Sequence, residues 1–175
     1  MEIMSYLESA GDTAKTLAES CFFKHDRGRD RTPAGFDRCG QNLHVWASSG
    51  GVSANPRDDI DWDRAVTSWH NEVDNFQFGN GSTNGKQIGH YTQVVWSKSN
   101  LVGCAVALCD INSPFSIRLP IWYLYVCNYC PSGNMQDPTT GNYYSPYALG
   151  TPASQCSSGE VADGYGGKLC KPSAP

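Results

Sequence analysis

Eight cysteines in 175 residues are the feature that most constrains how this chain folds. Thiols stay reduced inside most cells, so this cysteine content is typical of an oxidising compartment. There is one close C-x-x-C pair, Cys127 and Cys130, and no second pair accompanies it, so the spacing does not resemble a zinc cluster. We therefore expect four disulfides and a secreted, extracellular protein.

The bulk composition indicates one globular domain with a core of its own. A net charge of −4, with no basic stripe, argues against a nucleic-acid partner. No run approaches 18 apolar residues, so we expect a protein that does not span a membrane. The N-terminus lacks a signal-peptide pattern, which suggests a chain given without its leader or a fragment. Asn80 begins a glycosylation sequon in a polar loop.

An apolar stripe at spacings of three and four predicts a helix over residues 3–25. Extended by four residues, this stripe reaches His25, which we expect to point toward the core or a cleft. A second helix is predicted over residues 60–76, capped by Asp59 or Asp61. Its buried stripe comprises Val66, Trp69, Val73 and Phe76. Glu72 lies at the edge of that stripe, where a carboxylate needs a partner or water.

Two runs rich in β-branched and aromatic residues, 101–109 and 117–127, predict an antiparallel hairpin. If the hairpin folds about residues 115–116, Cys104 lies opposite Cys127, which permits a disulfide. The second strand is apolar on both faces and therefore needs cover on both sides. The last 15-residue segment, closed by Cys156 and Cys170, has no core pattern and is expected to be a loop.

The stretch GHYTQVVW, residues 89–96, places His90 where a polar, glycine-rich loop meets an apolar run. The local pattern leaves three roles open for His90: a hydrogen-bonded core histidine, a metal ligand or a general base. For His44, beside a tryptophan on an expected strand or turn over residues 39–48, we expect structural packing.

Several of these segments together resemble the CAP superfamily, which comprises cysteine-rich secretory, antigen 5 and plant pathogenesis-related proteins. The likeness is carried by CGQNL (39–43), GHYTQVVW, LVGCAVALC (101–109) and YVCNYCPSGN (125–134), and it extends from about Met4 to Tyr147. The cysteine spacing is most similar to the animal cysteine-rich secretory branch.

The resemblance implies an α+β fold, an α-β-α sandwich with a central antiparallel sheet stapled by disulfides. It also implies the pairs Cys21–Cys109, Cys39–Cys130 and Cys104–Cys127, with Cys156–Cys170 left by subtraction. The family's first helix has no counterpart here. We expect a CAP-like domain over residues 1–150 and a short disulfide-closed extension over residues 151–175.

Family members carry two histidines and two glutamates in one cleft, and the resemblance places these positions at His25, His90, Glu72 and Gln41. The two histidines are then the metal ligands, for weakly bound Zn²⁺, and Glu72 and Gln41 line the cleft. The amide of Gln41 carries no charge. From charge alone, we expect Gln41→Glu to tighten Zn²⁺ binding.

Three functions remain open on the sequence. The first is a secreted binding or effector module whose ligand is a sterol, another small lipid or a cell-surface protein. The second is a metal-dependent hydrolase or protease with Glu72 as general base. The third is a venom-type or reproductive effector that acts on a channel or cell surface. Because no nucleophile motif is present and Gln41 removes one acid, we favour a protein that is not an enzyme.

Overall fold

The computed structural model describes residues 1–136 and 145–172. Its centre is a four-stranded sheet in the order β1-β5-β6-β2. These strands are β1 (Ser5–Tyr6), β2 (Gly40–Trp46), β5 (Leu101–Cys109) and β6 (Trp122–Cys130). The pairs β5–β6 and β6–β2 are antiparallel, but β1 pairs with β5 in parallel. The sheet is therefore mixed, whereas the expectation was a wholly antiparallel one.

The β5–β6 hairpin has the register that the sequence predicted. Cys104 pairs directly with Cys127, and the hairpin is centred between residues 115 and 116. The second strand, however, covers Trp122–Cys130 rather than 117–127. Pro120 has no amide hydrogen for a β-ladder, and residues 110–121 form the connection instead.

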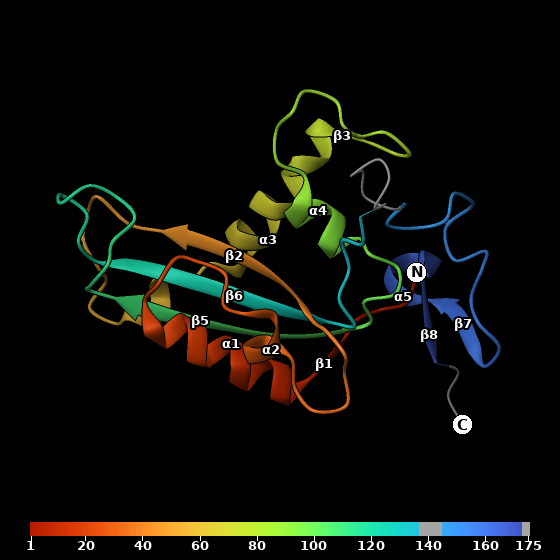
Figure 1. The fold of residues 1–175 in the computed structure, drawn as a ribbon, viewed down its shortest axis with the longest axis horizontal. Coiled ribbons are helices and arrows are strands. Elements are labelled where there is room, and N and C mark those ends of the chain that lie inside the picture. Colours follow the sequence, from red (N-terminus) through yellow and green to blue (C-terminus); the bar gives the residue numbers. More distant parts are fainter. Residues whose placement is uncertain (137–144, 173–175) are drawn as a thin grey trace.

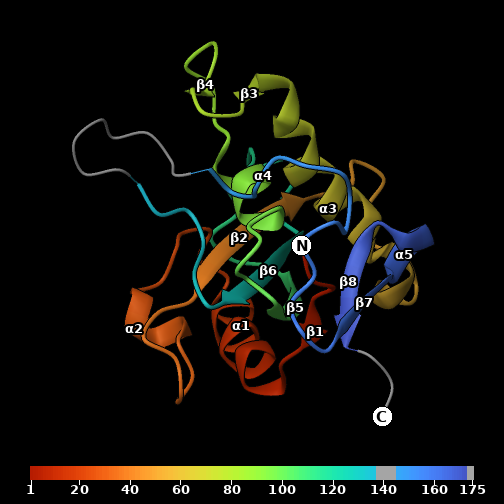
Figure 2. The same cartoon turned by 90° about the vertical axis from the view of Figure 1, so that its right-hand side faces the viewer.

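Helices cover both faces of the sheet, which confirms the predicted sandwich (Figures 1 and 2). Helix α1 (Glu8–Ser20) packs its small residues against Trp122, Leu124 and Val126 on one face. Helices α3 (Trp62–His70) and α4 (Gly89–Val94) cover the other face, where Tyr123 and Tyr125 belong to the core. All nine residues of β6 are buried, because successive side chains point to opposite faces of the sheet and helices cover both faces.

Both predicted helices are shorter than expected. Helix α1 ends at Ser20 because Cys21 takes a left-handed conformation (φ 54°) and its amide caps the carbonyl of Ala18. Helix α3 begins after Asp61, whose carboxylate accepts a hydrogen bond from the Arg64 amide, and a 3₁₀ turn, η2 (Asn71–Asn75), follows it. Val66, predicted to be buried, is 44% exposed.

Four disulfides link the eight cysteines in the expected pairs, and no cysteine is free. Where a loop was expected, the Cys156–Cys170 bridge closes a small C-terminal hairpin of β7 (Glu160–Asp163), α5 (Gly164–Gly167) and β8 (Leu169–Pro172). Backbone hydrogen bonds from Ile3 to Cys170 and from Cys170 to Met1 hold this hairpin beside the N-terminus (Figure 1). The division at residue 150 stays a prediction.

The remaining short elements lie in the connections. They are α2 (Gly28–Arg31), η1 (Pro56–Asp59), β3 (Phe76–Gln77) and β4 (Gly81–Ser82). Within residues 1–136 and 145–172, no helix is both long and apolar enough to cross a bilayer.

Candidate functional site

The candidate site is built around the edge strand β2, where two neighbouring residues point to opposite faces of the sheet. Gln41 lies on the face covered by α1, and Asn42 lies on the face covered by α3 and α4. Gln41 contacts His25, and Asn42 contacts His90. Strand β2 thus contacts both predicted metal ligands, His25 through Gln41 and His90 through Asn42, from opposite faces of the sheet.

His90 is held by Glu72 on the α3–α4 face. One carboxylate oxygen of Glu72 lies 2.8 Å from His90 Nδ1. The other accepts the backbone amides of His90 and Tyr91, at 2.8 and 3.1 Å. Asn42 Nδ2 donates to the His90 carbonyl at 3.1 Å. Burial opposes ionisation of Glu72, but these hydrogen bonds outweigh it, and the pKa of Glu72 lies below its ordinary value.

The Glu72 carboxylate also fixes which ring nitrogen of His90 carries the proton. An ionised carboxylate can only accept hydrogen bonds, so His90 Nδ1 must be the donor. A neutral His90 therefore keeps its lone pair on Nε2. Within the part of the chain that the structure describes, His90 Nε2 makes no hydrogen bond.

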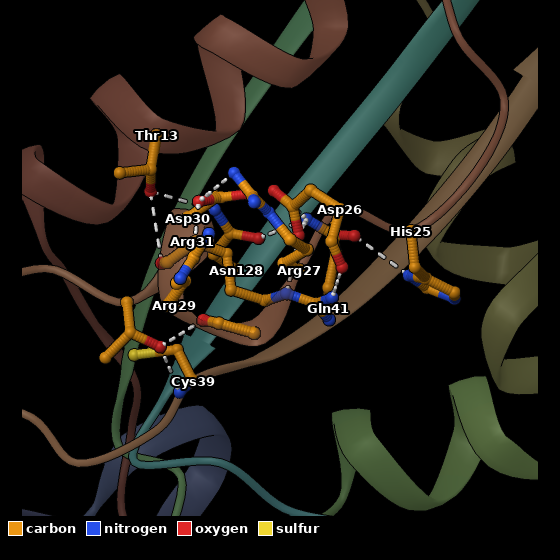
Figure 3. Close-up of polar contacts among 12 residues, drawn as sticks. Thr13, His25, Asp26, Arg27, Arg29, Asp30, Arg31, Cys39, Gln41 and Asn128 are labelled. Carbon is orange, nitrogen blue, oxygen red and sulfur yellow. Dashed lines mark hydrogen bonds and ion pairs between the residues drawn. The ribbon is translucent and has the colours of Figure 1, made fainter.

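His25 lies in the loop after α1, not on the helix itself, and its side chain is exposed. The prediction that His25 ends an inward-facing helical stripe is therefore wrong. His25 Nδ1 lies 2.8 Å from Gln41 Oε1 (Figure 3). Gln41 is 7% exposed, so one partner of this contact is buried and the other is open to solvent.

A chain of hydrogen bonds orients the Gln41 amide. Asn128, opposite Gln41 on β6, donates from Nδ2 to Thr13 Oγ1 at 3.0 Å and to the Ala10 carbonyl. Its Oδ1 therefore accepts from Gln41 Nε2, at 2.9 Å. This leaves Gln41 Oε1 as an acceptor, so His25 donates from Nδ1 and a neutral His25 keeps its lone pair on Nε2.

Asp26 explains why an amide suits position 41. Both carboxylate oxygens of Asp26 lie 3.4 Å from Gln41 Nε2 (Figure 3). Asp26 in turn pairs with Arg31, with 2.6 Å between Arg31 Nε and Asp26 Oδ1, and both side chains are largely buried. A carboxylate at position 41 would face the acceptor oxygens of Asp26 and Asn128. Gln41 supplies N–H groups where a glutamate side chain would add a second negative charge.

The described residues offer the two predicted metal ligands no complete three-atom coordination set. Among the described residues, neither His25 nor His90 belongs to a group of three ligand atoms within 4.8 Å of one another. Glu72 holds His90 in place, and its oxygens already accept three hydrogen bonds. One group of three does occur, Cys156, Glu160 and Cys170, but its two sulfurs form a disulfide.

The other predicted positions have plain structural settings. His44 packs its ring edge-on to Tyr125, with 5.7 Å between centroids, and its Nδ1 lies 2.9 Å from Ser68 Oγ. Asn80 is exposed in the turn between β3 and β4, where a glycan could be attached. Glycosylation at Asn80 stays a prediction.

Sequence reasoning missed three residues of the site: Asp26, Asn42 and Asn128. Asn42 and Asn128 are 1% and 0% exposed, and a buried amide on a strand signals a structural or functional hydrogen-bond network. That signal was present in the sequence once the strands were placed. The contact of Asp26 with Gln41 joins a loop to the edge strand and gave no local signal.

A profile of the family described as "CAP: Cysteine-rich secretory protein family" matches residues 1–129. Two curated relatives are cysteine-rich venom proteins of Varanus varius. VAR11 is 39% identical over 87% of this chain and 55% of its own length. VAR10 is 40% identical over 85% of this chain and 56% of its own length. The chain thus spans about half the length of the curated relatives it matches.

Two solved structures are also similar in fold. NaASP2 with Zn²⁺ has a TM-score of 0.68 and 26% identity, over 98% of this chain and 77% of that one. Na-ASP-1 has a TM-score of 0.69 and 26% identity, over 98% of this chain and 38% of that one.

Proposed function

Since the chain belongs to the CAP family of cysteine-rich secretory proteins, we propose that it is a secreted binding or effector module. Its polar cleft would hold a divalent cation, with Zn²⁺ as the first candidate, between His25 and His90. The names of the two venom relatives support secretion and an effector role. The Zn²⁺ form of NaASP2, a protein of similar fold, supports the choice of metal.

One observation carries this proposal: both imidazoles donate from Nδ1 to a fixed acceptor. Metal-binding histidines characteristically use one ring nitrogen for the metal and donate from the other to a carboxylate or carbonyl oxygen. Gln41 and Glu72 are these acceptors, and they leave the two Nε2 lone pairs for a cation. Two nitrogens make a weak, open site, where Zn²⁺ would supply positive charge and free positions for water or a partner's oxygen.

An enzymatic role for Glu72 is less well supported. A general base needs a free lone pair and a pKa near the working pH. Glu72 already accepts three hydrogen bonds, and its pKa is shifted downward, away from neutrality. We therefore assign Glu72 to positioning His90 rather than to proton abstraction.

We propose that the partner is a component of a cell surface, either a protein or a small lipid such as a sterol. Exposed apolar side chains on the β5–β6 connection favour such a surface, because Ile117 is 95% exposed and Ile111 is 55% exposed. These residues are separate from the histidines. Sterol binding should therefore be the same with and without a chelator. If chelation abolished sterol binding together with metal binding, the two sites would not be separate.

The metal proposal is tested by zinc calorimetry on wild type, His25→Ala and His90→Ala. His70→Ala is the matched control, because His70 is exposed, packs its ring on Tyr91, and has no hydrogen bond to His25, Gln41, Glu72 or His90 among the described residues. We expect at least about a tenfold loss of affinity in the first two variants and none in the control. Affinity should also fall in acid, because the Nε2 atoms must be unprotonated. If His90→Ala unfolds the protein while His25→Ala leaves zinc binding unchanged, the proposal is wrong.

A further inference from the structure

A cavity of about 480 Å³ opens beside His25 and is lined mostly by polar residues. Its walls come from the start of β2, from α2 and the loops around it, from the segment after β6 and from α4. The lining residues are His25, Arg31, Arg38, Cys39, Gly40, Gln41, Gln93, Ser132, Gly133, Asn134, Met135 and Gln136. Two arginines and a histidine line the cavity, and no described lining residue carries a carboxylate. The charge of the walls therefore suits an anion.

Of the arginines in this region, Arg38 is the one without an ion pair among the described residues. Arg31 pairs with Asp26, and Arg27 and Arg29 both lie within ion-pair distance of Asp30. Over the described ranges, the Arg38 guanidinium has no acidic partner, and its chain neighbour Asp37 does not line the cavity. An exposed guanidinium at the rim of a cavity without acids is free to bind a ligand's oxyanion.

The backbone that carries Arg38 is fixed on both sides. The Arg38 carbonyl accepts the Ser132 amide at 2.8 Å, which joins the two walls of the cavity. The next residue, Cys39, donates its amide to Thr32 Oγ1 and forms a disulfide with Cys130. The Arg38 side chain therefore projects from an anchored position, so that less order must be imposed when a ligand binds.

The neighbouring residues Gly40 and Gly133 are also closely packed. A Cβ atom on Gly40 would lie 2.0 Å from Gln93 Oε1, so only glycine permits this approach. The same Gln93 oxygen accepts the Gly133 amide at 3.1 Å. These contacts pack Gln93 between the start of β2 and the segment after β6.

We propose that this cavity binds a small anion through its oxyanion group, a phosphate or carboxylate, with Arg38 as the main ion-pairing residue. Guanidinium groups bind such planar or tetrahedral oxyanions with two parallel hydrogen bonds. The volume exceeds that of a bare oxyanion and lies within the range of small-molecule sites. Binding does not need the cation, because Arg38 carries a permanent charge.

The experiment is calorimetry with three probes, inorganic phosphate, glycerol 3-phosphate and succinate, at constant ionic strength and with a chelator present. Arg38→Gln should weaken binding of the preferred probe about tenfold. Arg57→Gln is the matched control, because it removes the same charge from an exposed position in η1, outside the cavity. We expect the control to bind as wild type does.

The probes and a further variant separate the outcomes. Tighter binding of glycerol 3-phosphate or succinate than of phosphate identifies a small organic ligand and its class. His90→Ala should lose zinc binding but keep anion binding, and Arg38→Gln should do the reverse, so the anion and cation proposals fail independently. No binding of any probe, or an equal loss in Arg38→Gln and Arg57→Gln, would overturn the anion site.

Discussion

The two histidines of the candidate site each donate a hydrogen bond from Nδ1, but to acceptors that differ in charge. His90 is 19% exposed and donates to a carboxylate, whereas His25 is exposed and donates to a neutral amide. The carboxylate of Glu72 is stabilised by two backbone amides that point at it. At Gln41 the neighbour is another carboxylate, that of Asp26. Glu72 is thus a carboxylate where two backbone amides stabilise its charge, and Gln41 is a neutral amide where Asp26 would repel a second carboxylate.

The largest expected effect separates the two supports by deletion. Glu72→Ala leaves two backbone amides and the His90 ring without their acceptor, so we expect a loss of about 3 kcal/mol in unfolding free energy. Gln41→Ala strands only Asn128 Oδ1 in the interior, because His25 reaches water, and should cost about 1 kcal/mol. Denaturant unfolding of both variants measures the difference, and equal losses would show that the two halves are alike.

The next prediction reverses the expectation from charge alone. Gln41→Glu would set a carboxylate against Asp26 and Asn128 Oδ1, so we expect about 1–2 kcal/mol lower stability at pH 7 and no tighter zinc binding. The repulsion would raise the pKa of the new carboxyl in the folded state. The lost stability should therefore return as the pH falls and that group takes up a proton. Unfolding curves at pH 7 and pH 5 test this, and a stable variant that binds zinc more tightly contradicts it.

The pH dependence of the Glu72 half is also expected to be distinctive. Its pKa is lowered on folding, so ionised Glu72 contributes stability above its unfolded value of about 4.3. That contribution is lost as the pH falls through the lower, folded-state value. Wild type and Glu72→Ala should therefore converge in stability in acid. A gap that stays constant down to about pH 2 would mean that Glu72 acts by packing alone.

The smallest effect concerns His44, a histidine that has no acidic acceptor. Ser68 donates to the Ala65 carbonyl, so His44 donates from Nδ1 to Ser68, and its buried Nε2 has no partner among the described residues. Burial, followed by repulsion from Arg64 and His90, lowers the pKa of His44. Stability should therefore decline as the pH falls below about 6.5. His44→Asn places an amide, which does not titrate, beside Ser68 and should reduce this decline.

A titration of unfolding free energy from pH 7 to pH 5 on both proteins measures the His44 effect. Ser68→Ala is the useful control, because it removes the partner of Nδ1 but leaves the buried imidazole in place. An identical pH profile in wild type and His44→Asn would show that protonation of His44 is accommodated without cost.

The sequence, together with the family resemblance that it carries, was enough to predict the disulfide pairs, the hairpin register and the layer order. The apolar residues on both faces of β6 require two covering layers, and the resemblance to the family supplied the cysteine pairs. These features follow from patterns within short segments, or from motifs whose order along the chain is diagnostic. Helix ends were less accurate, since Cys21 ends α1 through a backbone conformation that hydrophobic periodicity does not encode.

Only the tertiary structure decided how the site is charged. The sequence showed Gln41 as the loss of an acid, but the fold places Asp26 beside it and Asn128 across from it, and these contacts favour the amide. It also placed Arg38 at the rim of a cavity while its neighbouring arginines are paired. The physical reason is that electrostatic and hydrogen-bonding energies depend on distances across the fold. Residues 26, 41 and 128 become neighbours only when a loop, an edge strand and a central strand have packed together.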